Sequence, residues 1–199
     1  MDTQTSNVEL TERLKLIENM IAEGRRGQES WGWSFVLWGV AYFIATAWAT
    51  CGHSDLAWPV TMIAAAVVTG VAASRMSRGR PETVLGRAIG AVWTAMGVCL
   101  FVLLLSLSIG GLGDGRIFVS IIGAMLGMAH AASAIILKWK MQFACAIIWL
   151  AAAVTSVFGT DNRAVDIFLA ATFFGQVVFG IYAMILESRR RRERGVAHA

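Results

Sequence analysis

Apolar and polar residues occur in long blocks along this chain. After a polar N-terminal segment come six apolar stretches that contain no Asp, Glu, Lys or Arg. They cover residues 31–51, 56–74, 88–110, 117–137, 141–158 and 167–186. A helix of about 20 apolar residues crosses the ~30 Å hydrocarbon layer of a bilayer. The pattern therefore predicts an all-α polytopic membrane protein with six transmembrane helices.

The composition excludes a soluble alternative. The chain has 199 residues, of which 57% are hydrophobic, and its mean hydropathy is +0.63. A soluble domain of this size has no interior large enough to bury six helices that are apolar on all sides. We therefore expect the lipid bilayer to be the main partner of this chain.

The positive charges predict the orientation of the helices. Of the 17 Lys and Arg residues, only Arg116 and Arg163 lie outside the N-terminal segment, the second and fourth gaps and the C-terminal tail. Short loops rich in Lys and Arg stay in the cytoplasm. We expect a cytoplasmic arm (1–30), a six-helix membrane domain (31–187) and a basic cytoplasmic tail (188–199), with the protein in a bacterial inner membrane. This bias also explains the net charge of +4 without any nucleic acid.

The N-terminal arm has the pattern of an amphipathic helix. Ser6 and Glu9 match a capping box at its start, and Gly24 is a typical stop. Three roles remain open for residues 6–26: packing on the bundle or on a sister subunit, lying on the membrane surface, or docking to another protein. The apolar positions are Leu10, Leu14, Ile17, Met20 and Ile21.

The external gaps are short, so consecutive helices are expected to form three antiparallel hairpins. Each external turn has a glycine followed two or three residues later by an aspartate, at Gly52–Asp55, Gly111–Asp114 and Gly159–Asp161. Triplication of an ancestral hairpin explains this pattern, and so does convergence, because Gly and Asp are common turn residues.

Small residues four apart predict where helices pack closely in a membrane. One such row lies in the fourth stretch and a second opens the third stretch. The residues are Gly123, Gly127 and Ala131, and Gly86 and Gly90.

One ionisable residue, His130, lies within the apolar stretches, and buried ionisable groups are default candidates for function. Counting along the helices places Gln176, Cys99 and Tyr42 at a similar depth. These four residues define a mid-membrane polar layer that suits a small polar ligand or a soft metal. The alternative is structural: a hydrogen bond from Gln176 or from a backbone carbonyl satisfies a neutral His130 and joins two helices.

The sequence contains two weaker candidate sites, one for a metal ion and one for lipid headgroups. Cys51, His53 and Asp55 have side chains that suit zinc or copper, but no partner cluster accompanies them, and we expect no metal site and no cofactor. The run from Arg189 to Arg192 is suited to anionic headgroups at the membrane surface. No nucleophile with a basic partner, no carboxylate pair in the membrane and no HExxH or phosphate-binding motif is present, so we expect no enzyme.

The segments Ile17-Glu18-Asn19-Met20-Ile21 and Trp31-Gly32-Trp33-Ser34-Phe35-Val36-Leu37-Trp38-Gly39 resemble a family of small bacterial membrane proteins. In that family a short cytoplasmic helix leads into an aromatic first span with Leu-Trp-Gly, and five more spans follow. The resemblance implies an inner-membrane location and no particular activity.

Two functions are compatible with the sequence. The first is a non-enzymatic scaffold or regulatory subunit that acts through helix–helix contacts and forms homo-oligomers. The second is a channel or uncoupled carrier for a small solute, with the polar layer around His130 and Gln176 as its site.

Overall fold

The computed structural model describes residues 2–52, 56–76, 83–111 and 113–197. These residues form helices and turns, with no strand among them. The helices are α1 (Asp2–Ser30), α2 (Gly32–Gly52), α3 (Ala57–Met76), α4 (Val84–Ile109), α5 (Gly115–Leu137), α6 (Lys140–Ser156), α7 (Asp161–Thr172), the π-helix η1 (Phe173–Val178) and α8 (Phe179–Ala197).

Each predicted apolar stretch forms a helix, and five helices of the described chain are long and apolar enough to span a membrane. These are α2, α3, α4, α5 and the continuous rod formed by α7, η1 and α8. The prediction of six spans is not confirmed, because α6 has only 17 residues. At 1.5 Å per residue it reaches about 25 Å, short of the ~30 Å apolar layer.

The C-terminal rod contains a π-helical segment. Helix α7 passes into η1 at Phe173 and continues as α8 from Phe179, with helical backbone angles at both junctions. A π-bulge inserts an extra residue into a helical turn and rotates the faces before and after it relative to each other; such bulges are frequent at functional sites. Gln176 lies inside this segment.

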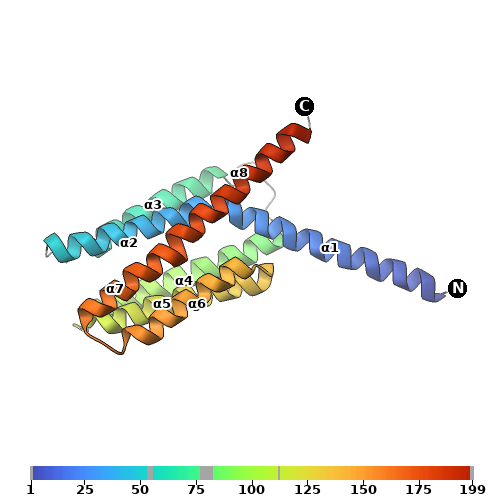
Figure 1. The fold of residues 1–199 in the computed structure, drawn as a ribbon. Helices are drawn as coiled ribbons and strands as arrows, with labels where there is room; N and C mark the ends of the chain where they lie inside the picture. The colour runs from blue at the N-terminus through green and yellow to red at the C-terminus, as the bar shows by residue number, and fades with distance from the viewer. Residues whose placement is uncertain (1, 53–55, 77–82, 112, 198–199) are drawn as a thin grey trace.

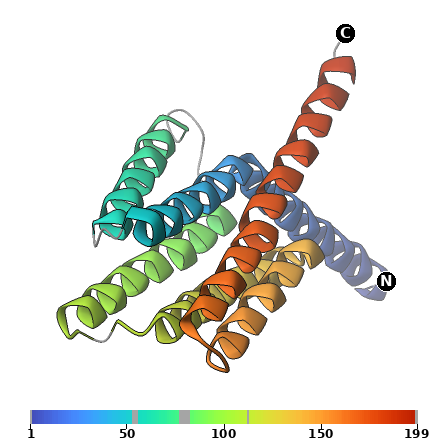
Figure 2. The ribbon, with the colours of Figure 1, turned by 60° about the vertical axis from the view of Figure 1, so that its left-hand side comes forward.

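The helices form two groups that the C-terminal rod connects (Figures 1 and 2). Helices α2 and α3 run side by side, while α4, α5 and α6 form a second layer. The rod of α7, η1 and α8 contacts both α2 and α6. In the described chain the backbone of α3 lies close to α2 alone, while its Trp58 ring reaches Phe118 of α5 and Phe168 of α7.

The grouping into three hairpins is not confirmed. The closest pair is α5 with α6, which were assigned to different hairpins. The sharp turn at Lys138, with φ at 49°, joins them, and the Trp139 amide donates to the Ala134 carbonyl at 2.9 Å. This turn forms a compact helix C-cap.

Glycines explain the closeness of α5 and α6. A Cβ on Gly123 would lie 2.9 Å from the Trp149 carbonyl oxygen, and one on Gly127 would lie 2.7 Å from Leu150 Cγ. Packing at these two predicted positions is confirmed, and the third residue of the row, Ala131, is half-buried.

The second predicted glycine row does not pack on another helix. A Cβ on Gly90 would meet no atom within 4 Å, and one on Gly86 would meet only the Thr83 hydroxyl of its own helix start. Close packing at Gly86 and Gly90 is therefore not seen within the described chain and stays a prediction. The sequence rule identifies residues that permit close approach, but the facing helix must also be there.

Helix α1 begins and ends elsewhere than its sequence signals suggest. It starts at Asp2, so Ser6 is not its N-cap, and it continues through Gly24 to Ser30. Gly24 is buried, and a Cβ there would lie 2.8 Å from Leu137 Cδ2 and 3.0 Å from Leu85 Cδ2. This glycine therefore lets α1 pass close to α4 and α5 and does not stop the helix.

Candidate functional site

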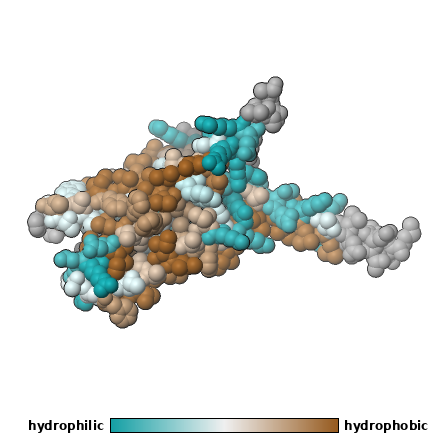
Figure 3. Space-filling model, in the orientation of Figure 1, coloured by the Kyte–Doolittle hydropathy of each residue, from teal (hydrophilic) through white to brown (hydrophobic). Residues whose placement is uncertain are grey.

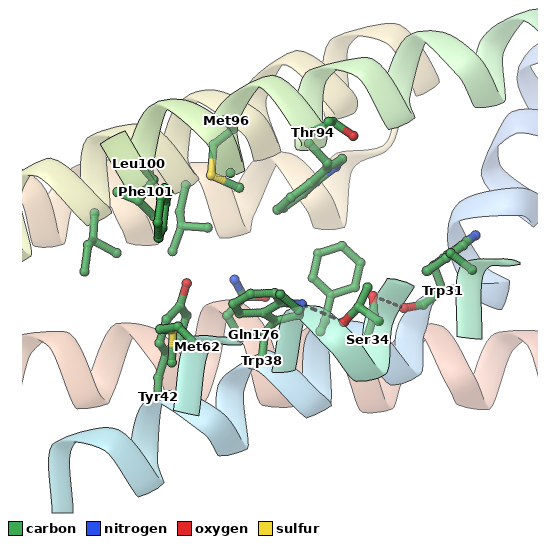
Figure 4. Close-up of a pocket in the computed structure, with 18 of the residues that line it drawn as sticks. Trp31, Ser34, Trp38, Tyr42, Met62, Thr94, Met96, Leu100, Phe101 and Gln176 are labelled. Carbon is green, nitrogen blue, oxygen red and sulfur yellow. Dashed lines mark hydrogen bonds between the residues drawn. The ribbon is translucent and has the colours of Figure 1, made fainter. Parts of the chain in front are cut away.

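A cleft of about 2890 Å³ separates α2, α3 and η1 from α4. Its wall is mostly apolar and includes several aromatic and methionine side chains (Figure 4). Residues that line it include Trp38, Tyr42, Met62, Trp93, Met96, Leu100 and Phe101. The backbones of α3 and α4 do not approach each other closely in the described chain, and side chains of both helices line the cleft.

Two residues of the predicted polar layer, Gln176 and Tyr42, line this cleft. The Gln176 side chain is 1% exposed, and its Oε1 accepts no hydrogen bond from the described residues. The Tyr42 ring packs edge-on against Phe168, with centroids 5.5 Å apart, and Figure 4 shows its hydroxyl directed toward α4. The π-helical turn positions Gln176, and aromatic packing positions Tyr42.

His130 lies apart from the cleft in a cage of aromatic rings. Its ring centroid is 5.0 Å from Trp93, 5.6 Å from Phe35 and 5.7 Å from Phe179. The side chain is fully buried, and neither nitrogen has a hydrogen-bond partner within the described chain. The expected bond between His130 and Gln176 is therefore absent, and aromatic edges and faces surround the imidazole instead.

Cys99 is exposed on α4 and is not among the residues that line the cleft. The structure thus brings Tyr42 and Gln176 to one surface and separates His130 and Cys99 from them. Depth along a helix follows from counting residues, whereas direction around the helix depends on packing.

No group of three metal-binding side chains occurs in the part of the chain that the structure describes. Cys51 is exposed at the end of α2. His53 and Asp55, the other two candidates for a metal site, lie outside the described residues.

Further buried polar groups were not anticipated from the sequence. Gln142 and Thr172 are fully buried, and their side-chain oxygens have no partner among the described residues; the same holds for the Trp149 indole nitrogen. Trp149 packs on the π-helix, where a Cβ on Gly175 would lie 2.6 Å from its Nε1.

Charged residues gather where α1 and α8 leave the apolar bundle, and we call this the basic end (Figure 3). Arg25 donates to the backbone carbonyls of Leu137, at 2.6 Å, and of Lys138, and so caps the end of α5. Arg190 pairs with Glu29 at 2.8 Å and ties α8 to α1. The Glu29 side chain is only 2% exposed, and its burial raises the pKa of this carboxyl while Arg190 opposes the shift.

The four arginines from Arg189 to Arg192 differ in their contacts and exposure. Arg190 and Arg191 line the mouth of the cleft, and Arg191 also pairs with Glu187 one turn earlier. Arg189 and Arg192 are exposed. The predicted contact of this run with membrane headgroups stays a prediction.

At the opposite end, Arg116 is paired with two aspartates. It lies 2.7 Å from Asp114 and 3.5 Å from Asp161, and so links the starts of α5 and α7. Asp114 also accepts the Arg116 backbone amide as the N-cap of α5. The Arg116 hydrogen bonds lower the pKa of Asp114 to about 2. This pairing compensates a positive charge outside the basic end.

Searches for related proteins give no match to a protein-family model, to a curated protein or to a solved structure. The helices themselves define the class. The chain is an all-helical protein whose long apolar helices are compatible with an integral membrane protein.

Proposed function

We propose that this protein is a non-enzymatic membrane scaffold or regulatory subunit of the bacterial inner membrane that self-associates through α1. The observation that carries the proposal is an uncovered apolar stripe on this helix. Leu10 is 55% exposed, Leu14 61% and Ile17 52%, although they lie on a helix more than 25 residues long.

This stripe is the continuation of the buried face of α1. Gly24 and Gln28 are buried where α1 meets the bundle. At 100° per residue they share a face with the apolar positions nearer the N-terminus. The N-terminal part of α1 extends beyond the bundle, so this face has no partner there within the described chain (Figure 1).

The spacing of the stripe fits a two-stranded coiled coil. Positions 10, 14, 17, 21, 24 and 28 follow intervals of four and three residues, which is the a/d repeat of a heptad. Leu10 and Ile17 occupy d positions, and Leu14 and Ile21 occupy a positions. Four apolar layers are too few for a stable free coiled coil, but anchoring both chains in one membrane raises their effective concentration.

Charge complementarity favours a second copy of this chain as the occupant. All copies insert with the same orientation, so their α1 helices project in the same direction and pair in parallel. In that arrangement Arg13, at a g position, faces Glu18 of the second copy at the following e position. Both side chains are exposed, and among the described residues Arg13 forms an ion pair with Glu9.

A charge exchange tests this pairing. Arg13→Glu is expected to weaken self-association because it places two acidic side chains opposite each other across the pair. The double variant Arg13→Glu with Glu18→Arg restores the opposite charges and should regain most of the lost affinity. Association is measured by Förster transfer between two labelled populations in liposomes.

The double variant is also a control for the loss of the ion pair between Arg13 and Glu9 within one chain. Both variants lose that pair, so it cannot explain a difference in association between them. Each exposed ion pair contributes about 0.2–1 kcal/mol, so the two symmetric pairs predict a change of up to about thirty-fold. Equal association of wild type and both variants would rule out this parallel interface.

The positive-inside rule supports the orientation in this proposal. The rule favours a cytoplasmic position for the basic end, which contains Arg25, Arg190 and the turn at Lys138. In this orientation α1 and the basic tail are cytoplasmic surfaces.

The alternative function, a channel or uncoupled carrier, is favoured by the unpartnered polar atoms of His130 and Gln176. The aromatic cage argues against a path through His130, because that side chain is fully buried. A liposome flux assay separates the two hypotheses. His130→Leu abolishes flux if the residue forms a constriction, whereas the scaffold hypothesis predicts no flux in the wild type.

A further inference from the structure

The cleft between α2 and α4 combines an apolar wall with one buried amide whose oxygen has no hydrogen-bond partner among the described residues. The charged residues that line it in the described chain all lie toward the basic end; they are Glu23, Arg26, Glu29, Glu187, Arg190 and Arg191. At the depth of Gln176, the wall carries uncharged side chains such as Trp38 and Met96. An occupant at that depth must therefore be uncharged, because a bare charge there would lack a partner.

Gln176 identifies the polar chemistry of such an occupant. Its side chain is 1% exposed, lines the cleft and has an oxygen without a hydrogen-bond donor among the described residues. Figure 4 shows the amide beside Trp38 and directed into the gap toward Met96, with the Tyr42 hydroxyl on the same side of the cleft. A primary amide both donates and accepts, and a phenol does the same. These groups together can pair with a carbonyl or with a hydroxyl.

The walls suit a flat conjugated ring. Trp38 donates its indole N–H to Thr69 at 3.1 Å, and Trp93 donates to Ser133 at 3.1 Å, so the polar edges of both indoles are satisfied within the protein. Trp38 also packs on Tyr42, and Trp93 on Phe35 and His130, but both side chains stay partly exposed and can make further ring contacts. Met62 and Met96 add polarisable sulfur atoms, which pack favourably against aromatic rings.

The size and the opening of the cleft indicate a long molecule that arrives from the lipid. Its volume of about 2890 Å³ is well above the ~300–1,000 Å³ typical of small-molecule pockets. Because the backbones of α3 and α4 stay apart in the described chain, a hydrocarbon tail can extend between the two helices into the bilayer.

We propose that this cleft binds an isoprenoid quinone or its quinol, with the ring between Trp38 and Met96 and its oxygen atoms at Gln176 and Tyr42. A quinone carbonyl accepts from the amide or the phenol, and a quinol hydroxyl donates to Gln176 Oε1. This inference is independent of self-association, because none of the residues that carry it lies on the exposed part of α1.

Binding of a quinone with a decyl tail to the full-length protein in nanodiscs tests the proposal. Quinones quench tryptophan fluorescence on contact, and Trp38 and Trp93 line the cleft. We expect a saturable quenching phase for the wild type. In Gln176→Leu the dissociation constant should rise about ten-fold, the effect of losing one or two hydrogen bonds.

Gln142→Leu is the matched control, because Gln142 is also a fully buried glutamine but does not line the cleft. Its dissociation constant should equal that of the wild type. Tyr42→Phe, which removes a single hydroxyl, provides a second test if Gln176→Leu does not fold. Decylbenzene, which has no oxygen, serves as the probe for purely apolar binding.

Three results would overturn the proposal. They are the absence of a saturable phase in the wild type, equal affinity of the wild type with both Gln176→Leu and Tyr42→Phe, and displacement of the quinone by decylbenzene at equal concentration. The last result would indicate a site for acyl chains that does not recognise oxygen atoms.

Discussion

Replacing Leu14 and Ile17 together by glutamate is expected to leave the protein monomeric in the membrane. In the proposed parallel pair, four apolar side chains leave the interface and four like charges enter it. Each Leu or Ile contributes about 1.5–3 kcal/mol when fully buried, so the loss exceeds a thousand-fold in association. Single-molecule photobleaching in liposomes counts the copies per complex directly.

The matched control places the same charges on another face of α1. Leu16→Glu with Asn19→Glu also exchanges one exposed leucine and adds two acidic groups, since Leu16 is 62% exposed and lies off the stripe. This variant should keep the oligomeric state of the wild type. If both double variants dissociate, net charge and not the stripe governs association.

Gly180→Leu is expected to prevent folding of the bundle. Helices α2 and α8 cross with their backbones in contact at this point. A Cβ on Gly180 would lie 2.7 Å from the Gly32 carbonyl oxygen and 2.9 Å from the Val36 backbone nitrogen. Backbone atoms cannot rotate away, so the helices must separate, at a cost above the ~1–3 kcal/mol of ordinary overpacking.

Gly97→Leu is the control for this change. Gly97 is exposed on α4, and a Cβ there would meet no atom within 4 Å. It should fold as the wild type does, as measured by thermal unfolding in detergent with circular dichroism. Equal melting temperatures for the two variants would show that the crossing of α2 and α8 is not tightly packed.

Some ends of the membrane helices follow from the sequence because charge and turn chemistry mark them, whereas α4 begins before its predicted stretch and the C-terminal rod extends beyond its stretch at both ends. The fourth stretch was expected to end at Leu137, and α5 ends there, beside the turn at Lys138. The predicted stop at Gly24 failed for a physical reason, since a glycine also serves where two helices touch. Only the presence of Leu85 and Leu137 beside it decides between these roles.

The packing of the helices and the make-up of the candidate site were harder to predict from the sequence than the helices themselves. Membrane helices are apolar on every side, so hydropathy does not identify which face meets a neighbour. Gly32 and Gly180 lie where the backbones of α2 and α8 meet, yet neither belongs to a row of small residues four apart. For the same reason, counting placed His130, Cys99, Gln176 and Tyr42 at one depth but did not separate the two that face the cleft. The π-helix at Gln176 also shifts the register of the last rod, which no sequence periodicity indicates.

Cysteine cross-linking along α1 tests the central proposal most directly. Single cysteines replace Leu10, Leu14, Ile17 or, as controls, Glu12 and Leu16, in a protein whose three native cysteines are changed to alanine. Oxidation in native membranes should give disulfide-linked dimers at positions 10, 14 and 17 and little product at 12 and 16. Equal cross-linking at all five positions, or none at the first three, would contradict the paired α1 helices.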